Sequence, residues 1–155
     1  MMINNIFVWG LNFKTAPIDY REKLACSNQE TPYLLRVLKS IEGVHELLIL
    51  STCNRVEIYA YLEGEEVLKD LVDTFLELKG VEKDKKRYSF TLRGKDAVFH
   101  IFKVASSLDS MVVGETQITS QFKQAFSLAK ETGTLGKILN RLYQWALKTA
   151  KRVRT

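Results

Sequence analysis

Hydrophobic and polar residues follow two periods along this chain, one typical of strands and one typical of helices. Four short stretches are rich in β-branched and aromatic residues, which predicts strands at residues 3–12, 46–52, 55–62 and 88–92. Helical spacing of apolar residues predicts amphipathic helices at residues 17–24, 34–41 and 67–78. Ser27 and Glu30 precede the second of these helices at capping-box spacing. The order β-α-β-β-α-β is that of the ferredoxin-like split βαβ arrangement, an antiparallel sheet backed by helices.

The last third of the chain has helical periodicity throughout. It predicts helices at residues 95–113, 117–130 and 135–154. We therefore predict an α+β protein in which a ferredoxin-like sheet over residues 1–93 is followed by about three helices over residues 94–155. Neither Gly nor Pro ends the last helix, so we expect it to continue into a part of the protein beyond this chain.

The last predicted helix has an apolar stripe and a basic stripe. The apolar stripe contains Leu135, Ile138, Leu139, Leu142, Trp145, Ala146, Thr149 and Val153. The basic stripe contains Lys137, Arg141, Lys148 and Arg152. The chain as a whole has 23 Lys and Arg against 18 Asp and Glu, a net charge of +5. This surplus is compatible with a nucleic-acid partner, although most small basic clusters are simply solvated surface.

Composition and cysteine usage exclude several classes of protein. The chain is 46% hydrophobic and 26% charged, as in ordinary globular proteins, and has no run of 18 apolar residues that would span a membrane. Its first residues lack the basic region of a secretory signal, so we expect a cytoplasmic protein without a membrane partner. Two cysteines are too few for a disulfide scaffold, and His45 and His100 do not pair with them at zinc-finger spacing. We therefore expect no metal and two free thiols.

Cys53 lies in the stretch LSTCNRVEIY at residues 50–59, in the turn between two predicted strands. A polar turn with backbone N–H donors and a nearby arginine favours a thiolate, so Cys53 is either a nucleophile or a bystander. Cys26, at a helix boundary, is more typical of a structural cysteine. Arg55 is either an exposed strand residue or a bidentate ligand for a substrate carboxylate. Strand alternation places one set of residues on the same face as Arg55: Glu57, Tyr59 and Tyr61.

Two further features could contribute to a site around the thiol. His100, in a mostly apolar helix, is either a satisfied core residue or an acid–base group. The segment 106–121 is rich in hydroxyl, carboxylate and amide side chains, and Gln117, Gln121 and Gln124 share one helical face. Such a cluster either forms the wall of a binding site or caps helix ends in water.

Three blocks of this sequence resemble the signature blocks of one family. They are GLNFKTAPIDYRE at residues 10–22, LSTCNRVEIY at 50–59 and HIFKVASSLDSMVVGETQITSQ at 100–121. In this order they are similar to glutamyl-tRNA reductase, and the match departs from the family at Phe13, often histidine, and at Thr116, often proline. The resemblance implies that residues 1–155 form the N-terminal catalytic domain, which recognises glutamate.

The resemblance also implies a reaction and the residues that perform it. In the family, a cysteine thiolate attacks the ester of glutamyl-tRNA(Glu), releases the tRNA and leaves a glutamyl thioester. Reduction with NADPH then gives glutamate-1-semialdehyde, the first step of tetrapyrrole (porphyrin) biosynthesis. The nucleophile of the family falls on Cys53 and its catalytic histidine on His100. Its glutamate-binding positions fall on Thr52, Cys53, Asn54, Arg55, Ser110, Glu115, Thr116, Gln117 and Gln121.

Other implications concern the remainder of the protein. In the family, the NADPH-binding domain and a dimerisation domain follow the catalytic domain, and no G-x-G-x-x-G fingerprint occurs in these 155 residues. We therefore expect a chain that stops before the NADPH domain, cannot complete the reduction and, in full-length form, is a homodimer. Glutamate-1-semialdehyde aminomutase, the next enzyme, is a further candidate partner.

Two other functions remain open from the sequence. A non-enzymatic RNA-binding module of ferredoxin-like fold would fit the basic surplus, although the aromatic-rich strands of an RNA-recognition motif are missing. A Cys–His hydrolase would use Cys53 and His100 as a dyad and would turn over simple esters without tRNA.

Overall fold

The computed structural model describes residues 2–82, 87–106 and 117–154 and contains one four-stranded antiparallel sheet. The strands are β1 (Ile6–Asn12), β2 (Val44–Ser51), β3 (Arg55–Leu62) and β4 (Phe90–Arg93). Their order in the sheet is β2-β3-β1-β4, so β1 lies between β3 and β4 and is antiparallel to both. The predicted α+β fold with the ferredoxin-like strand order is thus confirmed.

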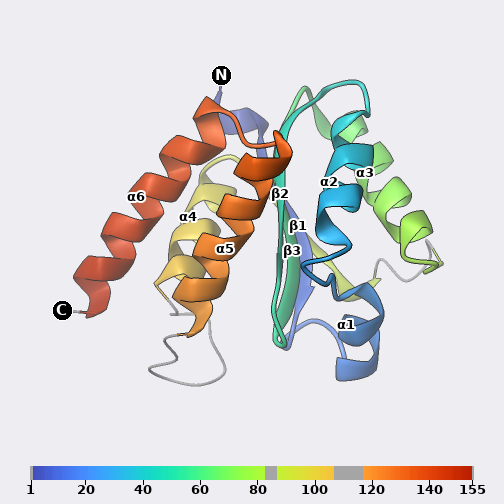
Figure 1. Cartoon of the computed structure of the whole chain (residues 1–155), viewed down its shortest axis with the longest axis horizontal. Helices are drawn as coiled ribbons and strands as arrows, with labels where there is room; N and C mark the ends of the chain where they lie inside the picture. The colour runs from blue at the N-terminus through green and yellow to red at the C-terminus, as the bar shows by residue number, and fades with distance from the viewer. Residues whose placement is uncertain (1, 83–86, 107–116, 155) are drawn as a thin grey trace.

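Helices cover both faces of the sheet, as Figure 1 shows with the sheet seen edge-on. One layer contains α1 (Ile18–Leu24), α2 (Thr31–Lys39) and α3 (Glu65–Leu78). The other layer contains α4 (Lys95–Ala105), α5 (Gln117–Thr132) and α6 (Lys137–Arg154). Among the described residues, no helix is both long and apolar enough to cross a membrane.

Because both faces are covered, the central strands β1 and β3 are buried along almost their whole length, with Tyr61 of β3 partly buried. All seven residues of β1 are buried. On one face Trp9 packs edge-on against Phe75 of α3, with ring centroids 5.9 Å apart. On the other face Tyr59 lies 6.4 Å from Phe122 of α5. Polar side chains of β3 that face α4 and α5 therefore lie in the interior, not in water.

The structure differs from the sequence prediction in the bounds of several elements and in the orientation of one side chain. Residues Ile3–Asn5 form a 3-10 turn, so β1 starts three residues later than predicted, which agrees with the turn preference of asparagine. The predicted helix 95–113 ends earlier, at Ala105 with Ser106 as its C-cap, and residues 107–113 lie outside the described residues. Trp145, predicted in the apolar stripe of the last helix, is 55% exposed. The buried side of α6 is formed by Leu139, Leu142 and Ala146, which the predicted stripe contains, together with Ala150.

The capping-box pair that precedes α2 is formed as its spacing predicted. The Ser27 N–H donates to Glu30 Oε2 at 2.9 Å, and the Glu30 N–H donates to Ser27 Oγ at 3.1 Å. Lys79, just after α3, donates to Glu30 Oε1 at 2.9 Å and to the Ala25 carbonyl at 2.8 Å. These bonds hold the loop between α1 and α2 against the end of α3.

A buried carboxylate from the sheet caps the N-terminus of α6. Glu46 of β2 is 6% exposed, and its Oε1 accepts the N–H groups of Gly136 and Leu139, both at 2.9 Å. Its Oε2 accepts the Ile138 N–H at 3.1 Å. A Cβ at Gly136 would lie 2.6 Å from Glu46 Cδ, so glycine is needed for this close approach. Glu46 therefore ties the direction of α6 to the sheet.

Replacing Glu46 with alanine should lower stability, because three N–H groups at the start of α6 lose their acceptor. We expect a loss of about 2 kcal/mol in the free energy of unfolding. The measurement is urea unfolding of the wild type, Glu46→Ala and the exposed control Glu77→Ala. Equal midpoints for the two variants would show that the cap contributes nothing.

Candidate active site

Cys53 lies at the exposed tip of the β2–β3 hairpin, in a turn fixed by three backbone N–H groups. The Thr52 N–H donates to the Arg55 carbonyl at 2.8 Å and closes the turn. The Asn54 N–H donates to Thr52 Oγ1 at 3.1 Å, and the Phe13 N–H donates to the Asn54 carbonyl at 2.9 Å. The hairpin tip is thus held both by its own strands and by the chain that follows β1, while the thiol stays accessible.

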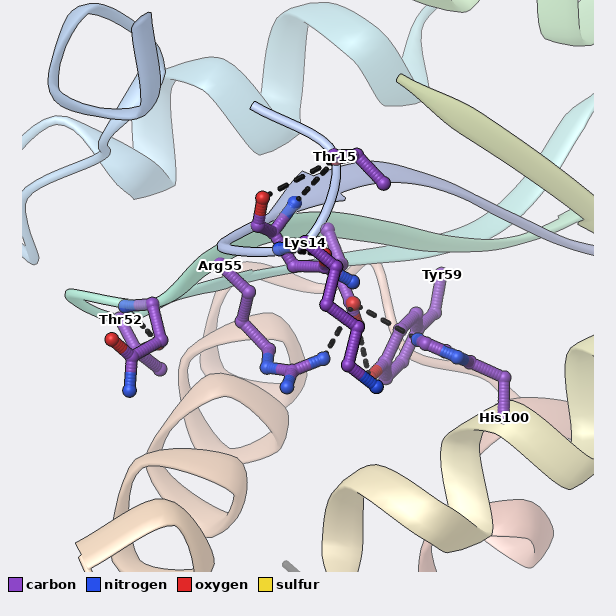
Figure 2. Close-up of polar contacts among 9 residues, drawn as sticks. Lys14, Thr15, Thr52, Arg55, Tyr59 and His100 are labelled. Carbon is purple, nitrogen blue, oxygen red and sulfur yellow. Dashed lines mark hydrogen bonds and ion pairs between the residues drawn. The ribbon is translucent and has the colours of Figure 1, made fainter. Parts of the chain in front are cut away.

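Arg55 begins β3 two residues after the thiol, yet its side chain is only 2% exposed. Its Nη1 donates to Oε2 of Glu57 at 3.0 Å. Glu57 is completely buried and also accepts from His100 Nε2, at 2.9 Å on Oε2, and from the Tyr59 hydroxyl, at 2.8 Å on Oε1. Figure 2 shows the Arg55 and His100 side chains approaching the same oxygen atom, which is Glu57 Oε2, from two sides. We call these four residues the Glu57 network.

Charges within the Glu57 network offset the cost of its burial. Burial alone would raise the pKa of Glu57, but the hydrogen bond and charge of His100, the Arg55 guanidinium and the Tyr59 hydroxyl together lower it. Burial and the neighbouring Glu57 carboxylate raise the pKa of Tyr59 well above its usual value, against the opposing charge of Arg55. Glu57 is therefore ionised and Tyr59 is a neutral hydrogen-bond donor at neutral pH. A carboxylate only accepts, so Nε2 of His100 carries a proton.

Gly10 provides the space that the Glu57 network occupies. It pairs with Glu57 across β1 and β3. A Cβ at Gly10 would lie 2.5 Å from the Val56 carbonyl oxygen and 2.8 Å from both Cα and Cγ of Glu57. Backbone atoms are among these neighbours, so a larger residue would have to separate the two strands beneath the network.

Replacing Gly10 with alanine should therefore destabilise the protein and disturb the Glu57 network. We expect a loss of about 1–3 kcal/mol, the range for overpacking a core. Urea unfolding measures the loss. Gly64→Ala is the matched control, because Gly64 has an extended φ of −178° and its nearest neighbour is the flexible end of Glu66, at 3.1 Å. Similar destabilisation by both substitutions would contradict the steric argument.

A second polar region lies at the β2 edge, where α5 passes α2. A cavity of about 130 Å³ is lined there by Cys26, Asn28, Thr31, Ile49, Ser51, Gln121, Gln124, Ala125 and Leu128. Ser51 Oγ accepts the Cys26 N–H at 2.9 Å, which connects this cavity to the strand end that leads to Cys53. Burial raises the pKa of Cys26 to about 12, with Lys79 lowering it and Glu30 raising it. A raised pKa disfavours the thiolate, which agrees with the structural role that the position of Cys26 in the sequence favoured.

The structure brings some of the predicted site residues together. Thr52, Cys53, Asn54 and Arg55 share the hairpin tip, and Arg55 is joined to His100 through Glu57. Within the described residues, the hydrogen-bond partner of His100 is Glu57 and not Cys53, so the dyad of a Cys–His hydrolase is not formed.

The remaining predicted residues lie elsewhere or outside the described part of the chain. Gln121 faces the cavity at the β2 edge. Ser110, Glu115 and Thr116 lie outside the described residues, and Gln117 is the first residue of α5 with a side chain that is not described. In the part of the chain that the structure describes, no group of three His, Cys, Asp or Glu side chains could hold a metal ion.

Glu57 and Tyr59 were not predicted to be site residues. Strand alternation places both on the face of Arg55, but alternation alone does not show that this face is buried. The available signal was a cation, a carboxylate and a hydroxyl at alternate positions of an otherwise apolar strand, in a chain with enough helices to cover both faces of the sheet. Buried charges need partners, and these three side chains provide them for one another.

A family comparison identifies the domain that contains this site. The family model described as "Glutamyl-tRNAGlu reductase, N-terminal domain" matches residues 9–155. The chain belongs to the glutamyl-tRNA reductase family. It is 57% identical over 155 residues to glutamyl-tRNA reductase from Aquifex aeolicus, covering 99% of this chain and 37% of that protein. The corresponding enzyme from a Sulfurihydrogenibium species is 43% identical over 153 residues, covering 97% of this chain and 35% of the relative.

A solved structure agrees with this assignment. Glutamyl-tRNA reductase from Methanopyrus kandleri superposes with a TM-score of 0.78 at 31% sequence identity, over 97% of this chain and 34% of that one. The chain therefore spans about a third of the length of these glutamyl-tRNA reductases. The match includes the Cys53 turn, β3 and His100, so the thiol and the Glu57 network lie within the N-terminal domain of the family.

Proposed function

We propose that this chain forms the part of a glutamyl-tRNA reductase that recognises glutamate and carries the nucleophilic thiol. One observation carries the proposal: Cys53 is exposed at the tip of a hairpin fixed by hydrogen bonds, next to a buried arginine held by Glu57. A reactive thiol needs access to its substrate and a rigid position, and this turn provides both. The family membership supports the same role.

The proposed step is an acyl transfer from glutamyl-tRNA to Cys53. The Cys53 thiolate attacks the ester carbonyl, a C–S bond forms, and the bond from the acyl carbon to the ribose oxygen breaks. That oxygen takes up a proton, so the products are a glutamyl thioester and free tRNA. We assign His100 as the acid–base group of this step, with Nδ1 as the atom that exchanges protons, because Nε2 is bonded to Glu57.

Arg55 is the proposed ligand for the glutamate side-chain carboxylate. Its bond to Glu57 fixes the plane of the guanidinium, which suits bidentate recognition of a second carboxylate. The Glu57 carboxylate also partly compensates the cost of burying the cation. Thr52, Asn54, Ser110, Glu115, Thr116, Gln117 and Gln121 complete the proposed glutamate site.

The reduction itself is proposed for the full-length protein. NADPH would supply the hydride that converts the thioester to glutamate-1-semialdehyde and begins porphyrin biosynthesis. No residue of this chain is assigned to the cofactor, since the 155 residues contain no G-x-G-x-x-G sequence. The chain alone would transfer glutamate to Cys53 and leave the thioester to hydrolysis. We further propose that the full-length protein is a cytoplasmic homodimer that interacts with tRNA(Glu) and with glutamate-1-semialdehyde aminomutase.

The test is to trap the acyl group on the protein. The chain is incubated with glutamyl-tRNA, quenched in acid and digested, and the modified peptide is identified by mass spectrometry. We expect the glutamyl group on the peptide that contains Cys53. Its capture on Cys26, or deacylation of the tRNA at an equal rate by the wild type and Cys53→Ser, would refute the proposed step.

A further inference from the structure

Helix α6 presents a face on which basic residues surround an exposed tryptophan. Lys137, Arg141, Trp145 and Lys148 follow one another at intervals of four, four and three residues. At 100° per residue these positions fall within an arc of about 80°, on the same side of the helix. All four side chains are exposed, with Trp145 at 55%. We call these four residues the α6 basic face.

The charge of α6 is out of proportion to the rest of the chain. Its 18 residues contain six Lys or Arg and no acidic residue, which leaves 17 basic and 18 acidic residues in the other parts of the sequence. The net charge of +5 therefore comes entirely from α6. Among the described residues, no salt bridge to Asp or Glu involves Lys137, Arg141 or Lys148. A surface of this kind attracts a polyanion.

The structure favours RNA over a membrane as that polyanion. An interfacial membrane helix inserts its apolar side into the lipid. In α6 that side is already buried in the domain core, through Leu139, Leu142, Ala146 and Ala150. The exposed face instead has an aromatic ring between cations, which suits stacking on a base beside phosphate contacts. Figure 1 shows α6 on the outside of its layer, where a large partner can approach.

We propose that the α6 basic face is a docking surface for the RNA part of the substrate. Lys137, Arg141 and Lys148 contact successive phosphates over about 17 Å of helix axis, and Trp145 stacks on an exposed base. The identity of the RNA as tRNA rests on the proposed function, whereas the surface itself is read from the charge and exposure of α6. The face that binds RNA is thus separate from the hairpin that carries the thiol.

The test uses full-length protein, fluorescently labelled uncharged tRNA(Glu) transcript and anisotropy at a series of salt concentrations. The triple variant Lys137→Gln, Arg141→Gln, Lys148→Gln should bind at least tenfold more weakly at low salt. The slope of its log affinity against log salt concentration should be smaller in magnitude by about 2–3, which corresponds to about one lost phosphate contact for each substituted residue. Trp145→Ala should weaken binding about fivefold or more, with little change in the slope.

A matched triple separates a docking surface from net charge. Lys23→Gln, Arg36→Gln, Lys69→Gln removes the same charge from exposed positions on α1, α2 and α3, and Tyr33→Ala removes an aromatic ring that is 56% exposed. These controls should leave the salt slope near that of the wild type. Equal effects of the two triples would overturn the proposal. Unchanged RNA affinity together with altered assembly of the full-length protein would also overturn it, because another part of that protein would then cover the face.

The two proposals can fail separately. The α6 triple should still form the glutamyl adduct on Cys53 at saturating glutamyl-tRNA, at the wild-type single-turnover rate. A wild-type protein that forms no adduct but binds RNA through α6 would refute the proposed function and support the docking surface. Normal adduct formation together with an RNA affinity that does not depend on α6 would support the proposed function and refute the docking surface.

Discussion

Replacing Cys53 with serine should reduce formation of the glutamyl adduct by roughly three orders of magnitude or more. The substitution is nearly isosteric, and the turn is held by backbone and Thr52 contacts that do not involve the side chain of residue 53. The fold should therefore be retained while the nucleophile is lost. Single-turnover deacylation of glutamyl-tRNA and mass spectrometry of the quenched protein measure the effect.

Cys26→Ser is the matched control for this experiment. Cys26 is half-buried, its Sγ donates to the Leu24 carbonyl at 3.3 Å, and burial raises the pKa of its thiol to about 12. It should therefore react slowly with iodoacetamide near neutral pH, and its replacement should leave adduct formation within about twofold of the wild type. Equal iodoacetamide labelling of the wild type and Cys53→Ser would contradict the assignment of the reactive thiol.

Replacing Glu57 with glutamine should cause the second large loss, in both stability and activity. The buried Arg55 guanidinium would lose the Glu57 carboxylate, and His100 and Tyr59 would lose the ionised acceptor that they share. Breaking a buried pair in this way costs about 3–5 kcal/mol in the free energy of unfolding. Adduct formation should fall as well, since Arg55 would no longer be held beside the Cys53 turn.

The loss of stability caused by Glu57→Gln should become smaller as the pH is lowered. The folded protein lowers the pKa of Glu57 below its ordinary value of 4.5, so its ionisation stabilises the fold above pH 4.5. This contribution is lost as the pH falls from 4.5 through the lower pKa that Glu57 has in the folded protein. The difference in unfolding free energy between the wild type and Glu57→Gln should thus be largest near neutral pH and decrease below pH 4.5.

Urea unfolding at several pH values measures this difference, with the exposed substitution Glu42→Gln as control. The control should change stability by less than about 0.5 kcal/mol. A Glu57→Gln protein as stable as the control at pH 7 would show that the network does not hold the fold. A stable but inactive variant would assign Glu57 to the site alone.

The hairpin tip of the candidate site could be located from the sequence, because its residues are local. The turn that carries Cys53 follows from two strands and the polar residues between them, and Cys26 could be separated from it by position alone. The pairing of Arg55 with Glu57 could not be predicted in the same way. Strand alternation shows that these side chains share a face, but whether that face meets water or helices depends on where α4, α5 and α6 pack.

Trp145 is a second case, on a helix, in which periodicity alone does not decide whether a side chain is buried. Its position near the edge of the apolar arc allowed it to point either inward or outward, and its hydrophobic character predicted a place among the core residues. In the structure α6 packs through Leu139, Leu142, Ala146 and Ala150, which rotates Trp145 into the basic stripe. Small residues at two of these positions let α6 pack closely, which leaves the indole outside.

The sequence by itself determined the order of strands and helices, the position of the exposed thiol and the excess of charge on the last helix. Each of these depends on residues close together along the chain, where periodicity, turn preference and composition act directly. Only the tertiary structure decided that Glu57 joins Arg55 to His100, that Gly10 leaves space for it, and that Glu46 caps α6. These contacts connect residues 43 to 93 positions apart, or across neighbouring strands, and depend on the way the layers pack.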